Sequence, residues 1–226
     1  MIKFFAKYKF FAIVMLFLSA IIIAFIYNAL KVEPKLPVYQ PDMVTADLVD
    51  STVQHVRKFH KVKDFQLINQ NGDTITQKEF DNHIYVTDFF FTTCQTICPV
   101  MTDNMKVLQD EFLEDDEIKL LSHSVTPTID TVEKLRAHAD LMGLIDGKWH
   151  MVTGDKKHIY NLARKEYLAS KTSGDGGPYD LVHTENFVLV DKEKRIRGFY
   201  DGTNDDEIQQ LIKDISILKR EYQIDK

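Results

Sequence analysis

The sequence predicts an α/β fold preceded by one membrane-spanning helix. Three observations lead to this fold class. A long apolar run lies near the N-terminus, segments typical of strands and helices alternate after it, and two cysteines lie where one of the strands gives way to a helix. The chain has 226 residues, and the part that follows the apolar run is large enough for one domain with its own core.

The apolar run covers residues 10–30 and contains no charged residue. At about 1.5 Å per residue its 21 residues form a helix of roughly 31 Å, which spans a bilayer. Lys3, Lys7 and Lys9 precede it without an acidic residue, which predicts a cytoplasmic tail at residues 1–9. A cleaved signal peptide is the alternative, but the run is longer than a typical signal core and no cleavage site follows. We therefore expect an anchor in the cell inner membrane, with the rest of the chain in the periplasm.

Residues 31–60 are expected to form an extended linker, because prolines recur at positions 34, 37 and 41. Residues 61–222 then form a single domain. The first 31 residues carry four Lys and no acidic residue, so the chain after them has a net charge of −10, compared with −6 for the whole chain. This acidic balance argues against nucleic acid as a partner and is compatible with metal ions and basic protein surfaces.

The first elements expected in the domain are a hairpin and a buried strand. Residues 65–68 and 74–75 flank Asn71-Gly72, a dipeptide typical of hairpin turns. Residues 84–91 form an apolar, aromatic run suited to a central strand.

Helices and strands alternate in the rest of the domain. We expect a helix at 99–112, a strand at 118–125, a helix from Asp130 as its cap to Met142, and a helix at 156–167. A second hairpin is expected from residues 187–190 and 195–200, and a last helix opens at Thr203 and Asp206. This order, with an N-terminal hairpin and a dithiol at the start of the first domain helix, predicts a thioredoxin-like fold.

Cys94 and Cys98 are the only cysteines of the chain and are four residues apart. One helical turn brings both sulfurs to one face, where they can hold a soft metal ion or close into a disulfide. A disulfide across so short a loop constrains the unfolded chain little, so a purely stabilising role is disfavoured. The three-residue spacer favours a ligand pair, and two thiolates with one imidazole suit Cu(I).

The histidine that supplies the third ligand is less well determined. His183 follows the glycine-rich stretch 173–178, which could swing an imidazole toward the dithiol, whereas His123 lies on the strand after the dithiol helix. From the sequence pattern alone, His183 is only modestly favoured over His123 as the third metal ligand. Met101 and Met105 follow the cysteines at helical spacing and are interpreted as core residues.

Four segments together resemble the Sco/SenC family: residues 91–99, 124–131, 149–155 and 179–191. The resemblance implies a membrane-anchored, thioredoxin-like copper protein that helps to assemble the copper centre (CuA) in subunit II of cytochrome c oxidase. It also implies that Cys94, Cys98 and His183 bind copper, as Cu(I) or also as Cu(II). A copper donor protein and a thioredoxin-like reductant are further expected partners. Family members commonly have Asp where this chain has Thr126 and Val182.

The functional hypothesis is a metallochaperone that delivers copper to the oxidase. The alternative is a thiol-disulfide oxidoreductase or redox sensor, in which Cys94 and Cys98 form a redox-active pair. The same pair could also reduce the cysteines of the target before copper is transferred. A peroxiredoxin-like enzyme is disfavoured, because Thr92 and Cys94 do not form the usual peroxidatic motif.

Overall fold

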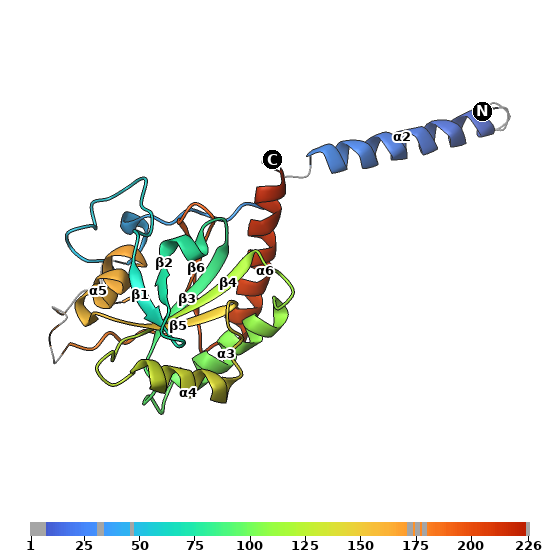
Figure 1. Ribbon diagram of the computed structural model, residues 1–226. Coiled ribbons are helices and arrows are strands. Elements are labelled where there is room, and N and C mark those ends of the chain that lie inside the picture. The colour runs from blue at the N-terminus through green and yellow to red at the C-terminus, as the bar shows by residue number, and fades with distance from the viewer. Residues whose placement is uncertain are drawn as a thin grey trace. The chain divides into compact units, whose positions relative to one another are not determined.

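The structure, a computed structural model, describes residues 8–30, 34–45, 48–170, 174, 177 and 180–224. It comprises two compact units, Met1–Lys35 and Leu36–Lys226, and each is considered by itself. Figure 1 labels the elements of both.

The first unit contains one long apolar helix, α2, at Lys9–Leu30. The stretch Lys9–Tyr27 is long and apolar enough to cross a membrane, and none of it is buried against the protein. The helix expected at residues 10–30 is therefore present. Lys3 and Lys7, on which the expected orientation depends, lie outside the described residues.

The second unit is built on a seven-stranded mixed sheet with the order β2-β1-β5-β4-β3-β6-β7. Its strands are β1 Gln66–Asn69, β2 Thr74–Thr76, β3 Ile84–Phe90, β4 Ile118–Ser124, β5 Trp149–Thr153, β6 Asn186–Val190 and β7 Ile196–Asp201. The three central strands β3, β4 and β5 are parallel, and the outer strands β1 and β6 run antiparallel to their neighbours β5 and β3. The parallel centre and the thioredoxin-like arrangement agree with the expected fold class.

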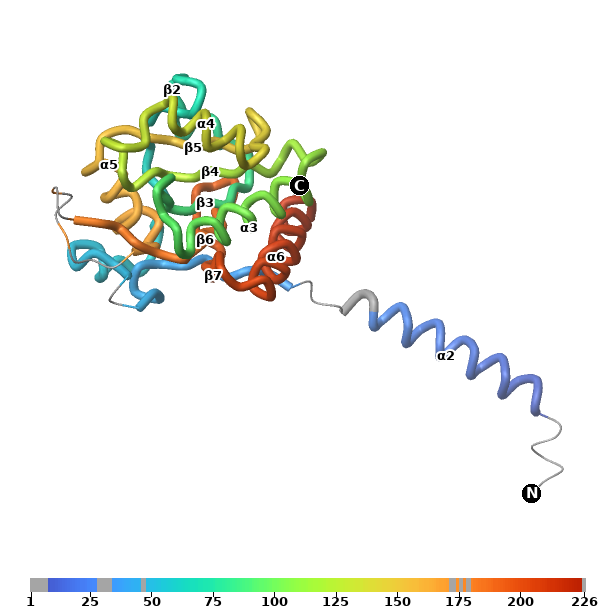
Figure 2. Tube along the Cα trace, turned by 90° about the horizontal axis from the view of Figure 1, so that it is seen from below, coloured from blue at the N-terminus to red at the C-terminus, as the bar shows by residue number. Residues whose placement is uncertain are grey.

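Helices cover both faces of this sheet (Figures 1 and 2). They are α3 Cys98–Glu111, α4 Val132–Met142, α5 Lys156–Asn161 and α6 Asp205–Ile224. Helix α5 continues as a π-helical turn, η4, at Leu162–Glu166, and two short 3-10 helices are η1 Pro41–Met43 and η3 Gln77–Phe80.

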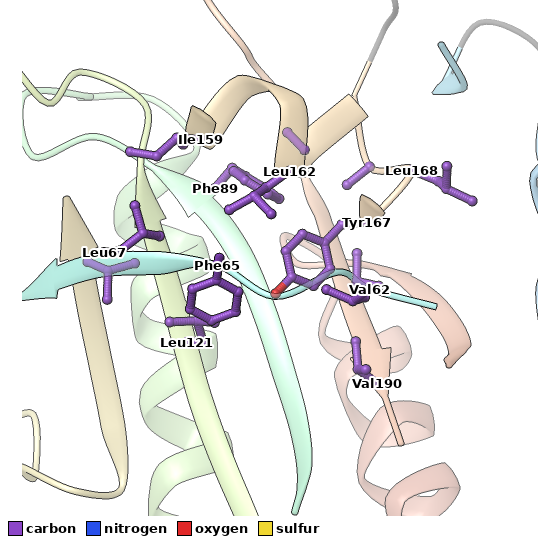
Figure 3. Packing of buried hydrophobic residues seen from close by; sticks show 14 of the residues in the cluster. Val62, Phe65, Leu67, Phe89, Leu121, Ile159, Leu162, Tyr167, Leu168 and Val190 are labelled. Atoms are coloured by element: carbon purple, nitrogen blue, oxygen red, sulfur yellow. The ribbon is translucent and has the colours of Figure 1, made fainter. Parts of the chain in front are cut away.

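Strand β3 separates two hydrophobic cores, because its side chains alternate between the faces of the sheet. Ile84, Val86 and Phe90 pack with α3, α4 and α6. Tyr85 and Phe89 pack on the opposite face with α5 and η4. Figure 3 shows the second core, in which Tyr167, Phe65 and Leu121 come together from three distant parts of the chain.

Strand β5 was not among the expected strands. Its five residues are all buried, so the alternation that identifies a half-exposed strand is missing from the sequence. Trp149 is 1 % exposed, and its indole N–H donates to Ser122 Oγ at 2.9 Å. The strand extends the parallel sheet beyond β4.

Two helix caps differ from expectation. Thr131, not Asp130, caps α4, because the Thr131 hydroxyl accepts from the Lys134 N–H while the carboxylate of Asp130 is engaged elsewhere. The start of α6 is capped by Asn204, whose side-chain oxygen accepts from the Asp206 N–H, and not by Thr203. Thr203 instead donates to Asp201.

Part of the interval expected to be a linker packs on the domain. The guanidinium of Arg197, 3 % exposed, donates to the carbonyls of Leu36 and Pro37 and pairs with Glu221. Tyr39 continues the contact by donating its N–H to the Ile196 carbonyl. The chain thus enters the domain at Leu36, beside the start of β7 and the end of α6.

Candidate dithiol site

The two cysteines lie together where β3 leads into α3. Cys98 is the first residue of α3, and its backbone N–H points to the Cys94 sulfur at 3.4 Å. Cys94 is half-buried and Cys98 is buried, and both are free thiols. The positive end of the α3 dipole and an N–H donor therefore favour a thiolate at Cys94.

The two thiols have very different acidity. Partial burial opposes ionisation of Cys94, but hydrogen bonds from Cys98 and Thr96 outweigh it and lower the pKa of Cys94 to about 7. Burial, together with the hydrogen bond to Cys94 and its charge, raises the pKa of Cys98 to about 12. The site thus presents one accessible thiolate that is supported by one buried thiol.

A buried carboxyl group, that of Asp88, lies on the same side of the sheet as Cys98. Asp88 is 2 % exposed, and burial raises the pKa of its carboxyl to about 7. Its charge also contributes to the raised pKa of Cys98. Its oxygen Oδ1 has no hydrogen-bond partner in the described part of the chain.

The loop that carries Cys94 is held by the buried carboxylate of Asp130. This carboxylate accepts from the Thr92 N–H at 3.3 Å, from the Thr92 hydroxyl at 2.5 Å, from Ser124 Oγ at 2.6 Å and from Thr126 Oγ1 at 3.0 Å. Asp130 is fully buried and forms no ion pair among the residues that the structure describes. It joins the cysteine loop to the loop after β4, a role that the sequence analysis missed.

Thr126 therefore has a defined place at one of the two positions where this chain departs from the usual family pattern. Its hydroxyl donates to Asp130, whereas a carboxylate at position 126 would bring a second negative charge to that buried group. At the other position, Val182 is 2 % exposed and belongs to the core shared with α5. In this chain both positions serve packing and hydrogen bonding.

His123 lies on the far side of the sheet from Cys98. Its ring stacks on Phe89 with centroids 4.8 Å apart, and its Nδ1 is 3.0 Å from Thr87 Oγ1. Complete burial lowers the pKa of this imidazole to about 3. The structure thus places His123 in the core opposite the dithiol, and it does not join the two cysteines.

His183 is exposed and lies in the irregular segment that leads into β6. That segment begins at Asp180, whose carboxylate accepts two hydrogen bonds of 2.7 Å from the guanidinium of Arg164. The Tyr160 hydroxyl lies 3.1 Å from the Asp180 carbonyl and 2.8 Å from the Val125 carbonyl, which ties the segment to the end of β4. The Val125 N–H also donates to the carbonyl of Phe90 at the end of β3.

Within the described residues, no three His, Cys, Asp or Glu side chains gather closely enough to hold a metal ion. The structure brings Cys94 and Cys98 together and leaves His183 outside their contact distance. Most of the glycine-rich stretch 173–178, the expected hinge, lies outside the described residues. Met101 and Met105 are fully buried in the core beneath α3, as expected of core residues.

Comparison with known proteins identifies the family pattern. The SCO1/SenC family model matches residues 53–219. A SCO1 protein homolog of Bacillus subtilis is 28 % identical over 158 residues, which cover 69 % of this chain and 81 % of the homolog. A putative copper-binding protein of Stutzerimonas stutzeri is 24 % identical over 148 residues, which cover 61 % of this chain and 67 % of that protein.

Solved structures agree with this family. BsSco, described with a disulfide switch as a member of the Sco family of cytochrome c oxidase assembly proteins, has 27 % sequence identity and a TM-score of 0.60. The match covers 70 % of this chain and 93 % of BsSco.

Proposed function

Because this chain belongs to the SCO1/SenC family, we propose that it is a copper-binding assembly factor for cytochrome c oxidase, anchored in the inner membrane by α2. The observation that carries the proposal is the dithiol, in which a half-exposed Cys94 of lowered pKa lies beside buried Cys98 at the start of α3. Support comes from BsSco, a relative described as belonging to a family of oxidase assembly proteins, and from a relative named for copper binding.

The copper ligands in this proposal are Cys94, Cys98 and His183. Soft thiolates and an imidazole suit Cu(I), and the imidazole also suits Cu(II) when the metal is received in that state. Copper must displace the proton of Cys98, whose pKa is raised to about 12, so loading releases protons. The accessible thiolate of Cys94 receives the ion first, and exposed His183 completes the set from the segment that Asp180 and Arg164 hold.

Delivery then proceeds by ligand exchange to the CuA centre of oxidase subunit II. The domain acts in the periplasm in this proposal, receives copper from a donor protein and is kept reduced by a thioredoxin-like protein. The accessible position of Cys94 supports such an exchange, because an incoming thiolate can reach the metal from solvent.

The test is copper binding by the reduced full chain in detergent. We expect one tightly bound copper per chain, loss of binding in Cys94→Ser, and affinity lowered at least tenfold in His183→Ala. The matched control is His55→Ala, because His55 is also exposed but far along the chain from the dithiol. Equal affinity of His183→Ala and the parent would remove His183 from the site.

A second candidate function is thiol-disulfide exchange, which the unequal acidity of the two thiols favours. The Cys94 thiolate would attack a disulfide of the target, and Cys98 would then release the reduced target as the Cys94–Cys98 disulfide forms. Two electrons and two protons thereby pass to the target cysteines. The same step would prepare those cysteines to receive copper.

The two functions predict a measurable exclusion. A Cys94–Cys98 disulfide leaves neither sulfur as a thiolate ligand, so copper uptake should require a reductant. Titration of the oxidised and the reduced full chain with copper measures this directly. One tight copper on the fully oxidised chain would place the ligands elsewhere.

A further inference from the structure

A basic loop at residues 55–63 stands out from an otherwise acidic domain. It contains four Lys or Arg and no acidic residue, namely Arg57, Lys58, Lys61 and Lys63, and all four are exposed. The rest of the chain after residue 31 then carries a net charge of −14, since the net charge of −10 includes these four positive charges. The loop is thus a local excess of positive charge on an acidic domain.

The tip of the basic loop presents an aromatic side chain to solvent. Phe59 is 90 % exposed, more than any other large apolar side chain in the described part of the chain. Its φ of 66° lies in the left-handed region, which a bulky residue rarely adopts. Packing within the domain does not explain this conformation, because the ring contacts solvent.

Hydrogen bonds at its base fix the basic loop. The carbonyl of Val56 accepts from the Asp42 N–H at 3.3 Å before the tip, and the His60 N–H donates to Gln40 Oε1 at 2.9 Å after it. The Val62 N–H donates to the Lys194 carbonyl at 2.9 Å. Phe59 is therefore held on a fixed base.

The positive charges at the tip are available to a partner. Arg57 lies 3.9 Å from Asp42 with its side chain 83 % exposed, and no ion pair joins Lys58 or Lys61 to another described residue. Lys63 pairs with Glu166 at the base of the loop. A surface with free cations around one exposed aromatic ring matches an anionic lipid surface, where cations meet headgroups and the ring enters the interface.

The basic loop lies at the end of the sheet where the chain enters the domain. The Val62 N–H donates to the carbonyl of Lys194, which lies in the β6–β7 turn. This turn follows Val190 at the end of β6, and Val190 pairs with Tyr85 near the start of β3. Cys94 follows the other end of β3, roughly 17 Å further on at about 3.3 Å per residue. In Figure 1 the blue-green loop and the C-terminal end of α6 lie at the top of the domain, and α4 lies at the bottom.

We infer that the basic loop binds the anionic surface of the bilayer in which α2 is anchored. This inference rests on the proposed membrane anchor, because Gln40 at the base of the loop is only ten residues beyond Leu30 at the end of α2. Binding at this end leaves the dithiol at the opposite end of the sheet, facing away from the bilayer. The domain would then offer Cys94 to a partner site that projects from the membrane.

The experiment places a fluorophore at the tip of the full chain. Phe59→Trp adds one indole to a chain whose single native tryptophan, Trp149, is buried and serves as an internal reference. The chain is reconstituted in bilayers with brominated acyl chains, composed either of neutral phosphatidylcholine or of phosphatidylcholine with phosphatidylglycerol. The matched control is Leu141→Trp, because Leu141 is 76 % exposed on α4 at the other end of the domain.

We expect bromine to lower the emission of the indole introduced by Phe59→Trp about twofold or more in the anionic bilayer, and high salt to restore it. Emission in the neutral bilayer and emission of the Leu141→Trp variant should change little. Adding Lys58→Glu and Lys61→Glu to the Phe59→Trp chain should abolish the difference between the two bilayers. Unchanged far-ultraviolet circular dichroism of each variant verifies the fold.

Three results would overturn the inference. Equal quenching in both bilayers would mean that tethering alone brings the loop to the membrane, and no quenching in either would mean that the loop does not reach it. Emission that shifts with protein concentration and not with lipid charge would assign the loop to an acidic surface of a second copy. If the chain failed to float with neutral bilayers, the anchor would be contradicted, and quenching with anionic vesicles would still decide the loop.

Discussion

At the scale of single residues, the two sulfurs of the site differ in exposure and in pKa. Cys94 combines exposure with a pKa lowered to about 7, whereas Cys98 combines burial with a pKa raised to about 12. A thiolate near neutral pH is available at the surface, and the second sulfur ionises only when a metal or a forming disulfide takes its proton's place. In both proposed functions, copper binding and thiol exchange, the first step takes place at the same atom, Cys94 Sγ.

This asymmetry predicts selective alkylation. In the reduced chain, iodoacetamide should modify Cys94 with a rate that rises through about pH 7, because the reactive thiolate is lost as the pH falls below the lowered pKa. At neutral pH Cys98 of the same reduced chain should react roughly a hundredfold to a thousandfold more slowly than Cys94, since the higher nucleophilicity of Cys98 offsets part of the pKa difference. Mass spectrometry of the pH series measures both rates, and similar rates for the two cysteines would refute the asymmetry.

Asp130 predicts a stability effect at the same scale. Asp130→Ala removes a buried acceptor and leaves the hydroxyls of Thr92 and Ser124 without it, which should lower the free energy of unfolding by about 3 kcal/mol. Urea unfolding followed by the emission of Trp149 is the measurement. The control is Asp103→Ala, because Asp103 is exposed on α3 and its loss should cost about 0.5 kcal/mol or less. Equal effects of the two changes would show that Asp130 does not hold the loop.

At the scale of elements, local patterns predicted most of the fold. Three features depend only on residues that are close in the sequence, so a local pattern predicts them. They are the Asn71-Gly72 turn, the apolar run of β3 and the position of the cysteines at the start of α3. Strand β5 was missed because burial on both faces removes its alternation.

The support of the site was not predictable in the same way. The donors to Asp130 come from two segments that the parallel pairing of β3 and β4 brings together, so no local pattern contains them. Likewise, His123 is kept away from the dithiol because its side chain lies on the other face of the sheet. The sequence places it on a strand without saying which core that side chain enters.

The packing of the segment that carries His183 should control the position of this proposed third ligand. Asp180→Asn should break the buried pair with Arg164, whose guanidinium is held at 2.7 Å, and loosen the segment that leads to His183. We expect copper affinity to fall about tenfold while the pH dependence of Cys94 alkylation stays unchanged, because the dithiol is held separately by Asp130. Asp155→Asn is the control, since the Asp155 carboxylate caps α5 by accepting from the His158 N–H. A shifted Cys94 profile in Asp180→Asn would show that the two loops are not independent.

At the scale of the whole molecule, the proposed copper site and the proposed anchor belong to different parts of the chain. Helix α2 contributes an apolar surface, and the second unit, from Leu36 onward, contains both cysteines and His183. A factor that meets a membrane-embedded oxidase gains from being held in the same plane, because tethering raises the effective concentration of its partner. The two functions should therefore be separable.

We expect that replacing residues 1–31 with a cleavable export signal leaves copper binding intact and lowers oxidase assembly at native expression. Overexpression should restore assembly, because a higher concentration of the released domain compensates for the lost tether. Oxidase activity in membranes and copper content of the purified protein are the two measurements, with the unaltered chain expressed at the same level as the control. Full oxidase activity with the released domain at native levels would reduce the anchor to a means of export. A loss of copper binding would instead show that the domain needs the N-terminal residues to form its site.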